Sequence, residues 1–406
     1  MAIDKKPIPT GIELTVLDPA YQEDPYPILE HLRQADPVHH DAVLNRYVLT
    51  RAADVEALLW DRSLSVDPRK AAPGTFEANF VMTERDREPS MLLSDPPYHT
   101  RLRKLVSKAF TAKAVEDMRP RIQEITDELL DAIDGAGEVD LMKAFCEPLP
   151  TIVIAEMLGV DPADRDDFKH WSDTGVMSFN PLLSAEERTV VNAASEALGE
   201  YFRRAIAERR ERRRNDLVTS LVEAEVEGEK LTEDEIVTMC ALLLAAGNVT
   251  TTDLVGNGIH ALLRNPDQLQ LLRADTSLIK NAVEEILRFD APVTQSGRTP
   301  LEPYEINGVP IAAGESVTPS LAAANRDPAA HPDPDSFDIT RRDAEHHSFG
   351  GGVHYCLGAP LARVEAQIAI GTLVSRFPKM RTGDSGLEWR RVPGFRGLAK
   401  LPVHLE

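Results

Sequence analysis

Apolar residues recur three and four positions apart along most of this 406-residue chain, which is the pattern of amphipathic helices. Strand signals are few: Tyr47–Thr50 is one candidate, and Pro300–Val317 predicts strands around the turn Ile306-Asn307-Gly308-Val309. Asp67–Ser94 and Asp327–Ser348 are rich in Pro and charge and predict irregular chain. We therefore expect a mainly α fold with a small β portion. The predicted helices cover Pro25–Ala35, Ala52–Leu59, Pro97–Phe110, Arg119–Ile133, Leu149–Met157, Arg165–Thr174, Ala185–Arg214 and Ala359–Phe377.

The longest predicted helix runs through the middle of the chain. Thr232-Glu-Asp-Glu235 is a capping box, and the helical pattern continues to Leu263. At 1.5 Å per residue this helix is roughly 48 Å long. Its centre places Gly247 before three threonines, Thr250 to Thr252. Because threonine hydroxyls can bond the carbonyl one turn back, we expect a local kink that leaves room for a small ligand or water; a purely structural kink is the alternative.

Composition narrows the function classes. A net charge of −21 and a pI near 5.0 argue against general affinity for nucleic acid or for anionic membranes. The three cysteines, Cys146, Cys240 and Cys356, have no zinc or redox spacing, so a reducing compartment is the simplest inference. No signal peptide pattern opens the chain, and the apolar run Met239–Gly247 is less than half of the ~20 residues of a membrane span. We expect a soluble, cytoplasmic protein forming a single domain over residues 1–406.

The segment Ser348–Gly358 carries the most specific chemistry. It has the form Phe-Gly-x-Gly-x-His-x-Cys-x-Gly, and a helix follows it. Cys356 thus lies just before a helix N-terminus, where free N–H groups favour a thiolate and depress its pKa. With no partner ligand at metal-binding spacing, a single thiolate indicates a metal held mainly by a macrocycle, as in haem iron with one axial thiolate. A buried structural cysteine is the alternative.

This loop resembles the cysteine-ligand signature of the cytochrome P450 family, and the resemblance extends over roughly Pro25–Leu401. It implies the P450 fold, with the long central helix over a buried haem b. Cys356 would be the iron ligand, and Phe349 and Gly358 would line the cofactor within the loop. On the central helix, the resemblance places Ala246 and Gly247 over the iron and makes Thr250 the alcohol of the oxygen-binding bend.

One position departs from the family pattern. Val249 stands where an Asp or Glu usually precedes the alcohol, and valine cannot relay a proton. Thr250 would then work through waters alone, or Asn248 or Asp253 would help by another path. We expect Thr250 to matter in either case.

The resemblance also implies the residues that hold the haem propionates. His99 and Arg103 are four apart on one helix face, Arg298 follows the Glu-x-x-Arg helix, and His354 lies two residues before the ligand. Ordinary surface charges are the alternative for each. Glu285 and Arg288 form the Glu-x-x-Arg pair, whose role would be structural, with Arg341 of the irregular stretch as its third member.

Partners and substrate are implied less directly. Between Arg101 and Arg121 the sequence has seven cations and only Glu116 and Asp117 as acids, so this stretch would steer a ferredoxin or flavodoxin-type electron donor; a solvated helix pair is the alternative. The seven cations are Arg101, Arg103, Lys104, Lys108, Lys113, Arg119 and Arg121.

The residues that the resemblance brings to the substrate are mostly apolar, which indicates a small apolar or aromatic molecule. These pocket residues are Phe80, Val81, Met177, Phe179, Leu243, Val293 and Phe395.

The resulting prediction is a haem-thiolate monooxygenase that uses O₂ and two electrons to oxidise a C–H bond. Two alternatives stay open at this point. Val249 suggests a peroxide-driven or otherwise atypical enzyme of the same fold. A haem-based sensor without turnover is the other, although the sequence has no regulatory or DNA-binding motif.

Overall fold

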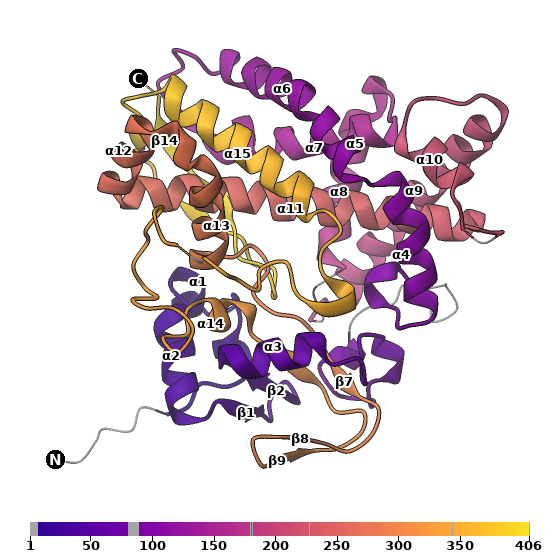
Figure 1. Cartoon of the computed structure of the whole chain (residues 1–406), viewed down its shortest axis with the longest axis vertical. Coiled ribbons are helices and arrows are strands. Elements are labelled where there is room, and N and C mark those ends of the chain that lie inside the picture. The colour runs from indigo at the N-terminus through magenta and orange to yellow at the C-terminus, as the bar shows by residue number, and fades with distance from the viewer. Residues whose placement is uncertain are drawn as a thin grey trace.

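A computed structural model describes residues 7–79, 89–178, 180, 182–226, 228–342 and 344–405. Helices dominate it, as the periodicity predicts (Figure 1). In Figure 1 several short strands lie at the lower end of the molecule, and others lie among the helices above them. The longer helices are α2 (Tyr26–Ala35), α3 (Ala52–Trp60), α4 (Tyr98–Ala109), α6 (Arg119–Asp131), α7 (Pro148–Leu158), α8 (Arg165–Met177), α9 (Ala185–Glu211), α11 (Glu233–Arg264), α12 (Pro266–Ala274), α13 (Ile279–Phe289) and α15 (Ala359–Arg376).

The central helix α11 crosses the whole helical part of the molecule (Figure 1). Its N-terminus is the predicted capping box: Thr232 Oγ1 accepts from the Glu235 N–H, and the Glu235 carboxylate accepts from the Thr232 N–H. Helices α7, α8, α9 and α15 pack directly on it. Beyond Thr250 nearly every residue of α11 is buried, so the helix forms the axis of the core.

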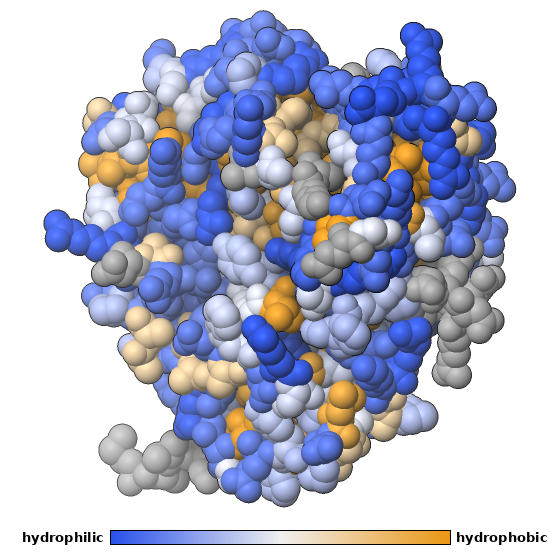
Figure 2. All heavy atoms as spheres, turned by 45° about the vertical axis from the view of Figure 1, so that its right-hand side comes forward, coloured by the Kyte–Doolittle hydropathy of each residue, from blue (hydrophilic) through white to orange (hydrophobic). Residues whose placement is uncertain are grey.

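Helix α11 is also the one described helix that is long and apolar enough to cross a membrane by length and composition. Half of its most apolar window is buried inside the protein, as expected for a core helix. On the face drawn in Figure 2 hydrophilic residues dominate, and hydrophobic residues form small separate groups.

The β portion consists of small sheets. Strand β2 (Arg46–Leu49) pairs antiparallel with β1 (Val38–Asp41) and parallel with β10 (Val317–Pro319). Strands β8 (Tyr304–Ile306) and β9 (Val309–Ile311) form the predicted hairpin. Its turn requires positive φ at both central residues, which Asn307 (51°) and Gly308 (81°) supply.

A buried ion network joins α13 to the irregular chain that follows α14 (Leu321–Asn325). Both oxygens of Glu285 accept from Arg288, at 2.7 and 2.8 Å, and Arg341 Nε lies 3.2 Å from the same carboxylate. Arg288 also donates to the backbone carbonyls of Asn325, Pro334 and Ser336. The predicted third member, Arg341, is therefore confirmed, and the network fixes the chain that leads into the cysteine loop.

Candidate active site

The cysteine loop lies against the end of α3. Gly350 and Gly352 have φ values of 69° and 61°, which favour glycine. A Cβ on Gly352 would stand 2.5 Å from the Leu59 carbonyl oxygen, so this glycine also permits a close backbone approach. The Cys356 N–H donates to the Phe349 carbonyl at 2.9 Å and closes the loop just before α15 begins. The loop thus holds one sulfur in a fixed position at a helix N-terminus.

The electrostatics of Cys356 differ from the prediction. Burial raises the pKa of the thiol, and this outweighs the N–H groups of Gly358 and Ala359 and the charges of Arg103 and Arg363, all of which act to lower it. The predicted depressed pKa is therefore wrong for the free thiol. A bound metal ion would take the place of the proton, and the same N–H groups and cations would then stabilise the thiolate.

Sequence analysis missed Arg363. Its guanidinium lies 4.5 Å from the centre of the Phe349 ring and donates to the Tyr355 hydroxyl and to the carboxylate of Glu284. Phe349 is thus fixed between the loop and α15. The available signal was the position of Arg363 in the second turn of the helix that follows the cysteine.

Three of the predicted propionate-binding residues share one site with Arg103 and Cys356. The His99 and His354 rings lie 4.2 Å apart, although α4 and the cysteine loop are distant in sequence. Burial, followed by the charges of His99 and Arg298, lowers the pKa of His354 to about 3. Arg298 is buried and bonds Ser296 and the Gly297 carbonyl within its own loop. The fold therefore gathers basic side chains around one cysteine.

This grouping fits an anionic ligand. Within the described chain the buried Nδ1 of His99 has no hydrogen-bond partner. Burial lowers the pKa of both Arg103 and Arg298, which marks guanidinium groups held away from water. A ligand with two carboxylates would neutralise these cations and occupy the free imidazole nitrogen. Iron protoporphyrin IX offers two propionates together with a metal for the thiolate, so the donor set fits it.

The central helix has no interruption at its centre. The helical assignment continues through Gly247 and the three threonines, and the kink expected there stays a prediction. The Thr250 hydroxyl does donate to the carbonyl of Ala246, at 2.7 Å, as predicted for a threonine bonding one turn back. Packing by the surrounding helices holds α11 continuous despite the poor helix formers at its centre. Ala246, Gly247 and Thr250 are half-buried, in contrast to the buried Val249.

The described residues of the predicted substrate pocket lie on packed elements. Val293 and Phe395 face each other in an isolated antiparallel bridge. Met177 ends α8, which packs on α11 near Ala245, and Leu243 lies half-buried on α11 itself. Phe80, Val81 and Phe179 fall outside the described residues.

Three of the seven cations in the predicted basic stretch form ion pairs within the chain, namely Arg101, Arg119 and Arg121. Arg101 bonds Glu229 and Glu235, Arg119 bonds Glu116, and Arg121 bonds Glu124, Glu128 and Glu156. These pairs reduce the local positive charge. Glu116 lies within the basic stretch, whereas Glu124, Glu128, Glu156, Glu229 and Glu235 lie beyond it and were not part of the local sequence count. Lys113 is exposed, and Arg103 lies near Cys356; the Lys108 side chain is outside the described residues.

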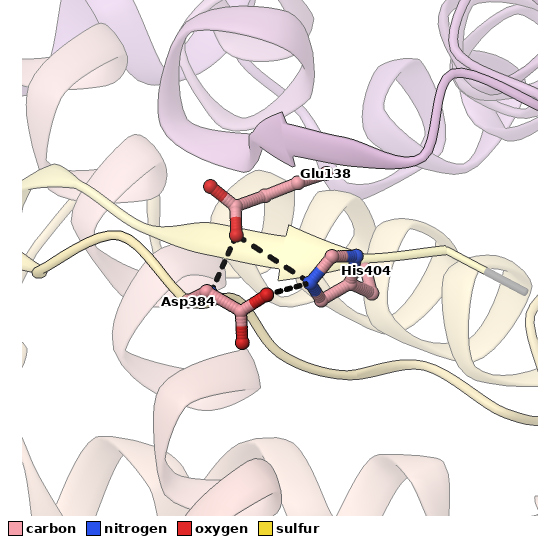
Figure 3. A group of neighbouring side chains, drawn as sticks. All are labelled: Glu138, Asp384 and His404. Atoms are coloured by element: carbon pink, nitrogen blue, oxygen red, sulfur yellow. Dashed lines mark hydrogen bonds and ion pairs between the residues drawn. The ribbon is translucent and has the colours of Figure 1, made fainter.

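Two other features lie outside this site. A surface groove of about 700 Å³ lies between α6 and α15, and none of its lining residues is predicted to hold cofactor or substrate. Glu138, Asp384 and His404 bring potential metal ligands within 4.8 Å of one another (Figure 3). His404 Nε2 lies 3.1 Å from Asp384 and 3.5 Å from Glu138, so these groups pair with each other and join the last strands of the chain.

Comparison with known proteins identifies the family. The sequence model described as Cytochrome P450 matches residues 171–383. Cytochrome P450 107B1 of Saccharopolyspora erythraea is 43% identical over 403 residues, which cover 96% of this chain and 97% of that protein. Vitamin D(3) 25-hydroxylase of Pseudonocardia autotrophica is 42% identical over 94% of both chains.

A solved structure has the same fold as this chain. The myxobacterial cytochrome P450 CYP267B1, crystallised with myristic acid, superposes with a TM-score of 0.89 at 38% identity and covers 96% of this chain and 98% of that one. The family model, the relatives and the solved structure agree on the family and the fold. The chain belongs to the cytochrome P450 family, whose members are monooxygenases with haem b as cofactor.

Proposed function

We propose that this monooxygenase takes two electrons from a ferredoxin- or flavodoxin-type carrier and hydroxylates a small apolar or aromatic substrate in the cytoplasm. The observation that carries the proposal is the grouping of His99, Arg298 and His354, together with Arg103, around the sulfur of Cys356. Three free cysteines are consistent with a reducing compartment.

Each part of the site has a distinct task in this proposal. When bound, haem b supplies the binding and reductive activation of O₂. The Cys356 thiolate would ligate the iron, and the N–H groups of Gly358 and Ala359 would limit the negative charge on the sulfur. The basic side chains would hold the two propionates.

Thr250 is the residue proposed to act on the reacting side. Its hydroxyl donates to Ala246, so its oxygen is oriented and its lone pairs can accept a proton from a neighbour. Val249 beside it is buried and apolar, and it helps to keep bulk water away from this part of the helix. Proton delivery then depends on groups other than residue 249.

The apolar side chains Leu243, Val293 and Phe395 support an apolar substrate. Relatives whose names or structures mention vitamin D(3) and myristic acid are consistent with this class. Binding such a molecule would expel water, which concentrates the oxidation on the bound C–H bond and limits loss of reduced oxygen species.

The proposal is tested by turnover. A panel of apolar candidates is first scored by the shift of the haem from low to high spin. Each binder is then incubated with NADH, ferredoxin reductase and ferredoxin, or with hydrogen peroxide alone. Hydroxylated product with the ferredoxin system is expected. Product with peroxide alone would favour the peroxide-driven alternative that Val249 suggests, and no substrate-dependent oxygen use would contradict the proposal.

A further inference from the structure

The helix centre lacks the usual acid, and two polar residues on the same helix could replace it. Asn248 precedes Val249, and Asp253 follows Thr250 by three positions. Residues three apart on a helix are neighbours on its surface, so Asp253 lies close to Thr250 along α11. The two candidates have very different surroundings in the structure.

Asn248 is committed to packing contacts. Its Nδ2 donates to Ser172 Oγ at 2.7 Å, and its Oδ1 accepts from Thr151 Oγ1 at 3.0 Å. These bonds tie α11 to α8 and α7. An amide also has no titrating proton at physiological pH, so Asn248 serves structure and does not supply protons.

Asp253 is fully buried and unsatisfied. Its side chain is 0% exposed, and within the described chain neither carboxylate oxygen accepts a hydrogen bond. Arg390 approaches one oxygen to 3.2 Å as an ion pair, without hydrogen-bond geometry. The carboxylate occupies the space beside Gly397, where a Cβ would collide with it. A buried acid without hydrogen bonds is costly, and its retention asks for a functional reason.

The groups around Asp253 come from three elements. Glu147 and the thiol of Cys146 lie at the start of α7, Asp290 caps the end of α13, and Arg390 follows strand β12 (Glu388–Trp389). Burial raises the pKa of the Asp253 carboxyl to about 7; Arg390 opposes this rise, and Glu147 and Asp290 add to it. The acid can therefore be protonated at neutral pH.

Arg390 connects this buried acid to the surface. Its side chain is 20% exposed, and its Nη2 lies 3.2 Å from Asp253 Oδ1, so this one side chain has contact with both the solvent and the buried acid. The backbone N–H of Arg390 donates to the Gly397 carbonyl at 2.8 Å. This bond fixes the chain segment that packs against Asp253. A small movement of one flexible arginine side chain would open a path from water to Asp253.

We propose that Asp253 is the internal proton donor to Thr250, with Arg390 as its gate to solvent. This inference rests on the proposed monooxygenase function. In it, Asp253 takes the role of the acid that is absent at position 249. Asp253 is a positioning residue in the sense that it acts through the Thr250 hydroxyl and touches neither substrate nor cofactor.

The transfer is balanced in protons. Neutral Asp253 passes its proton to the Thr250 oxygen, directly or through one water, while the Thr250 hydroxyl leaves its hydrogen bond to the Ala246 carbonyl and releases its own proton into the pocket. The Asp253 carboxylate that remains is re-protonated from solvent when the Arg390 guanidinium moves aside. Each cycle thus moves protons from solvent to the pocket and leaves both residues unchanged.

The first test does not depend on turnover. Infrared spectra of the haem-loaded protein are recorded between pH 5 and 9, and the C=O stretch of a protonated carboxylic acid is followed. A band that titrates near pH 7 and is absent in Asp253→Asn is expected. In Arg390→Gln its midpoint should move to higher pH, because the opposing cation is lost. A spectrum that is the same in wild type and Asp253→Asn would overturn the assignment.

The second test measures coupling, the product formed per NADH consumed. Asp253→Asn should lower coupling about tenfold and raise peroxide release, while substrate affinity stays unchanged. Placing the usual acid back in the double variant Val249→Glu/Asp253→Asn should restore most of the coupling. Asp234→Asn is the matched control, because Asp234 is an exposed acid in the first turn of the same helix that pairs with Arg203.

The outcomes separate the two proposals. Unchanged coupling and an unchanged pH profile in Asp253→Asn would overturn the proton-donor role while the enzyme remains a monooxygenase. Wild-type protein that fails to oxidise any bound substrate would refute the proposed function, and the infrared titration would still report whether Asp253 carries a proton. Lost coupling in Asp253→Asn without rescue by Val249→Glu, together with an unshifted infrared midpoint in Arg390→Gln, would indicate a merely structural acid.

Discussion

Glu285 and Asp253 are two buried carboxylates that each lie next to an arginine, and they differ in the hydrogen bonds that they accept. Glu285 accepts two short bonds from Arg288 and further bonds from Arg341 and the Asp338 N–H. Asp253 has one ion-pair contact with Arg390 and no hydrogen bond within the described residues. A satisfied carboxylate stabilises one conformation, whereas an unsatisfied one keeps a proton within reach of neutral pH. The same residue types therefore serve the fold in one place and chemistry in the other.

The largest expected effect comes from breaking the satisfied network. Arg288→Ala leaves Glu285 buried without its main partner, which typically costs about 3–5 kcal/mol. The cysteine loop then loses its support, so we expect little soluble protein and little bound haem. The measurement is the haem-to-protein ratio after purification, with the exposed Arg203→Ala as a control. Normal haem content in Arg288→Ala would contradict a structural role for the network.

Adding one methyl group beside Asp253 should give the next largest effect. In Gly397→Ala the new Cβ collides with the carboxylate, and overpacking of this kind typically costs about 1–3 kcal/mol. Urea denaturation should show this loss of stability. Gly386→Ala is the matched control, because its Cβ would meet no atom within 4 Å. Equal stability of the two variants would mean that Asp253 does not occupy the space beside Gly397.

The pH dependence of stability tests the raised pKa of Asp253 directly. The pKa of Asp253 is about 7 in the folded protein and 3.8 as its ordinary value, so the folded state binds more protons between these values. Asp253 therefore contributes stability below pH 4 that is lost as the pH rises towards 7. Asp253→Asn should remove this contribution and be more stable than wild type at pH 8. Parallel stability curves for wild type and Asp253→Asn from pH 4 to 8 would refute the raised pKa.

A smaller effect on stability, but a clear one on chemistry, is expected for Thr250. Thr250→Ala removes one half-buried hydroxyl and its bond to Ala246, which contributes about 1 kcal/mol. The fold and haem content should persist, and product per electron should fall several-fold. Thr252→Ala on the same helix is the comparison. If Thr250→Ala left product per electron unchanged, Thr250 would have no part in proton delivery.

The smallest expected effects concern the paired surface cations. Arg119 bonds Glu116 on the surface, and exposed pairs contribute about 0–1 kcal/mol. Arg119→Ala should leave stability unchanged and raise the KM for ferredoxin less than Lys113→Ala does, because the Arg119 charge is already neutralised. The initial rate at varied ferredoxin concentration measures this. A larger effect for Arg119 would show that its pair with Glu116 opens on docking.

Local patterns predicted the local structure well, and the reasons are physical. Periodicity depends on neighbours in sequence, so α11 begins at the capping box of Thr232 and the hairpin turns at Asn307-Gly308. The Glu285–Arg288 pair was likewise visible, because its partners are three residues apart. The family resemblance added Arg341, which sequence spacing alone does not connect to them.

The features that sequence analysis missed depend on distant segments. The pKa of Cys356 is raised because tertiary burial outweighs the local N–H groups that the loop pattern suggested. The Arg101 charge is neutralised by Glu229 and Glu235, far along the chain. The isolation of Asp253 likewise depends on Gly397 and Arg390 in the last part of the chain.

The central claim is that Cys356 is the one protein ligand of the haem iron. The most direct measurement is the absorption spectrum of the freshly purified, reduced protein under carbon monoxide. We predict the long-wavelength band of thiolate-bound iron in the wild type, its retention in His354→Ala, and its loss in Cys356→Ser. A wild-type spectrum typical of imidazole ligation, or an unchanged band in Cys356→Ser, would contradict the account.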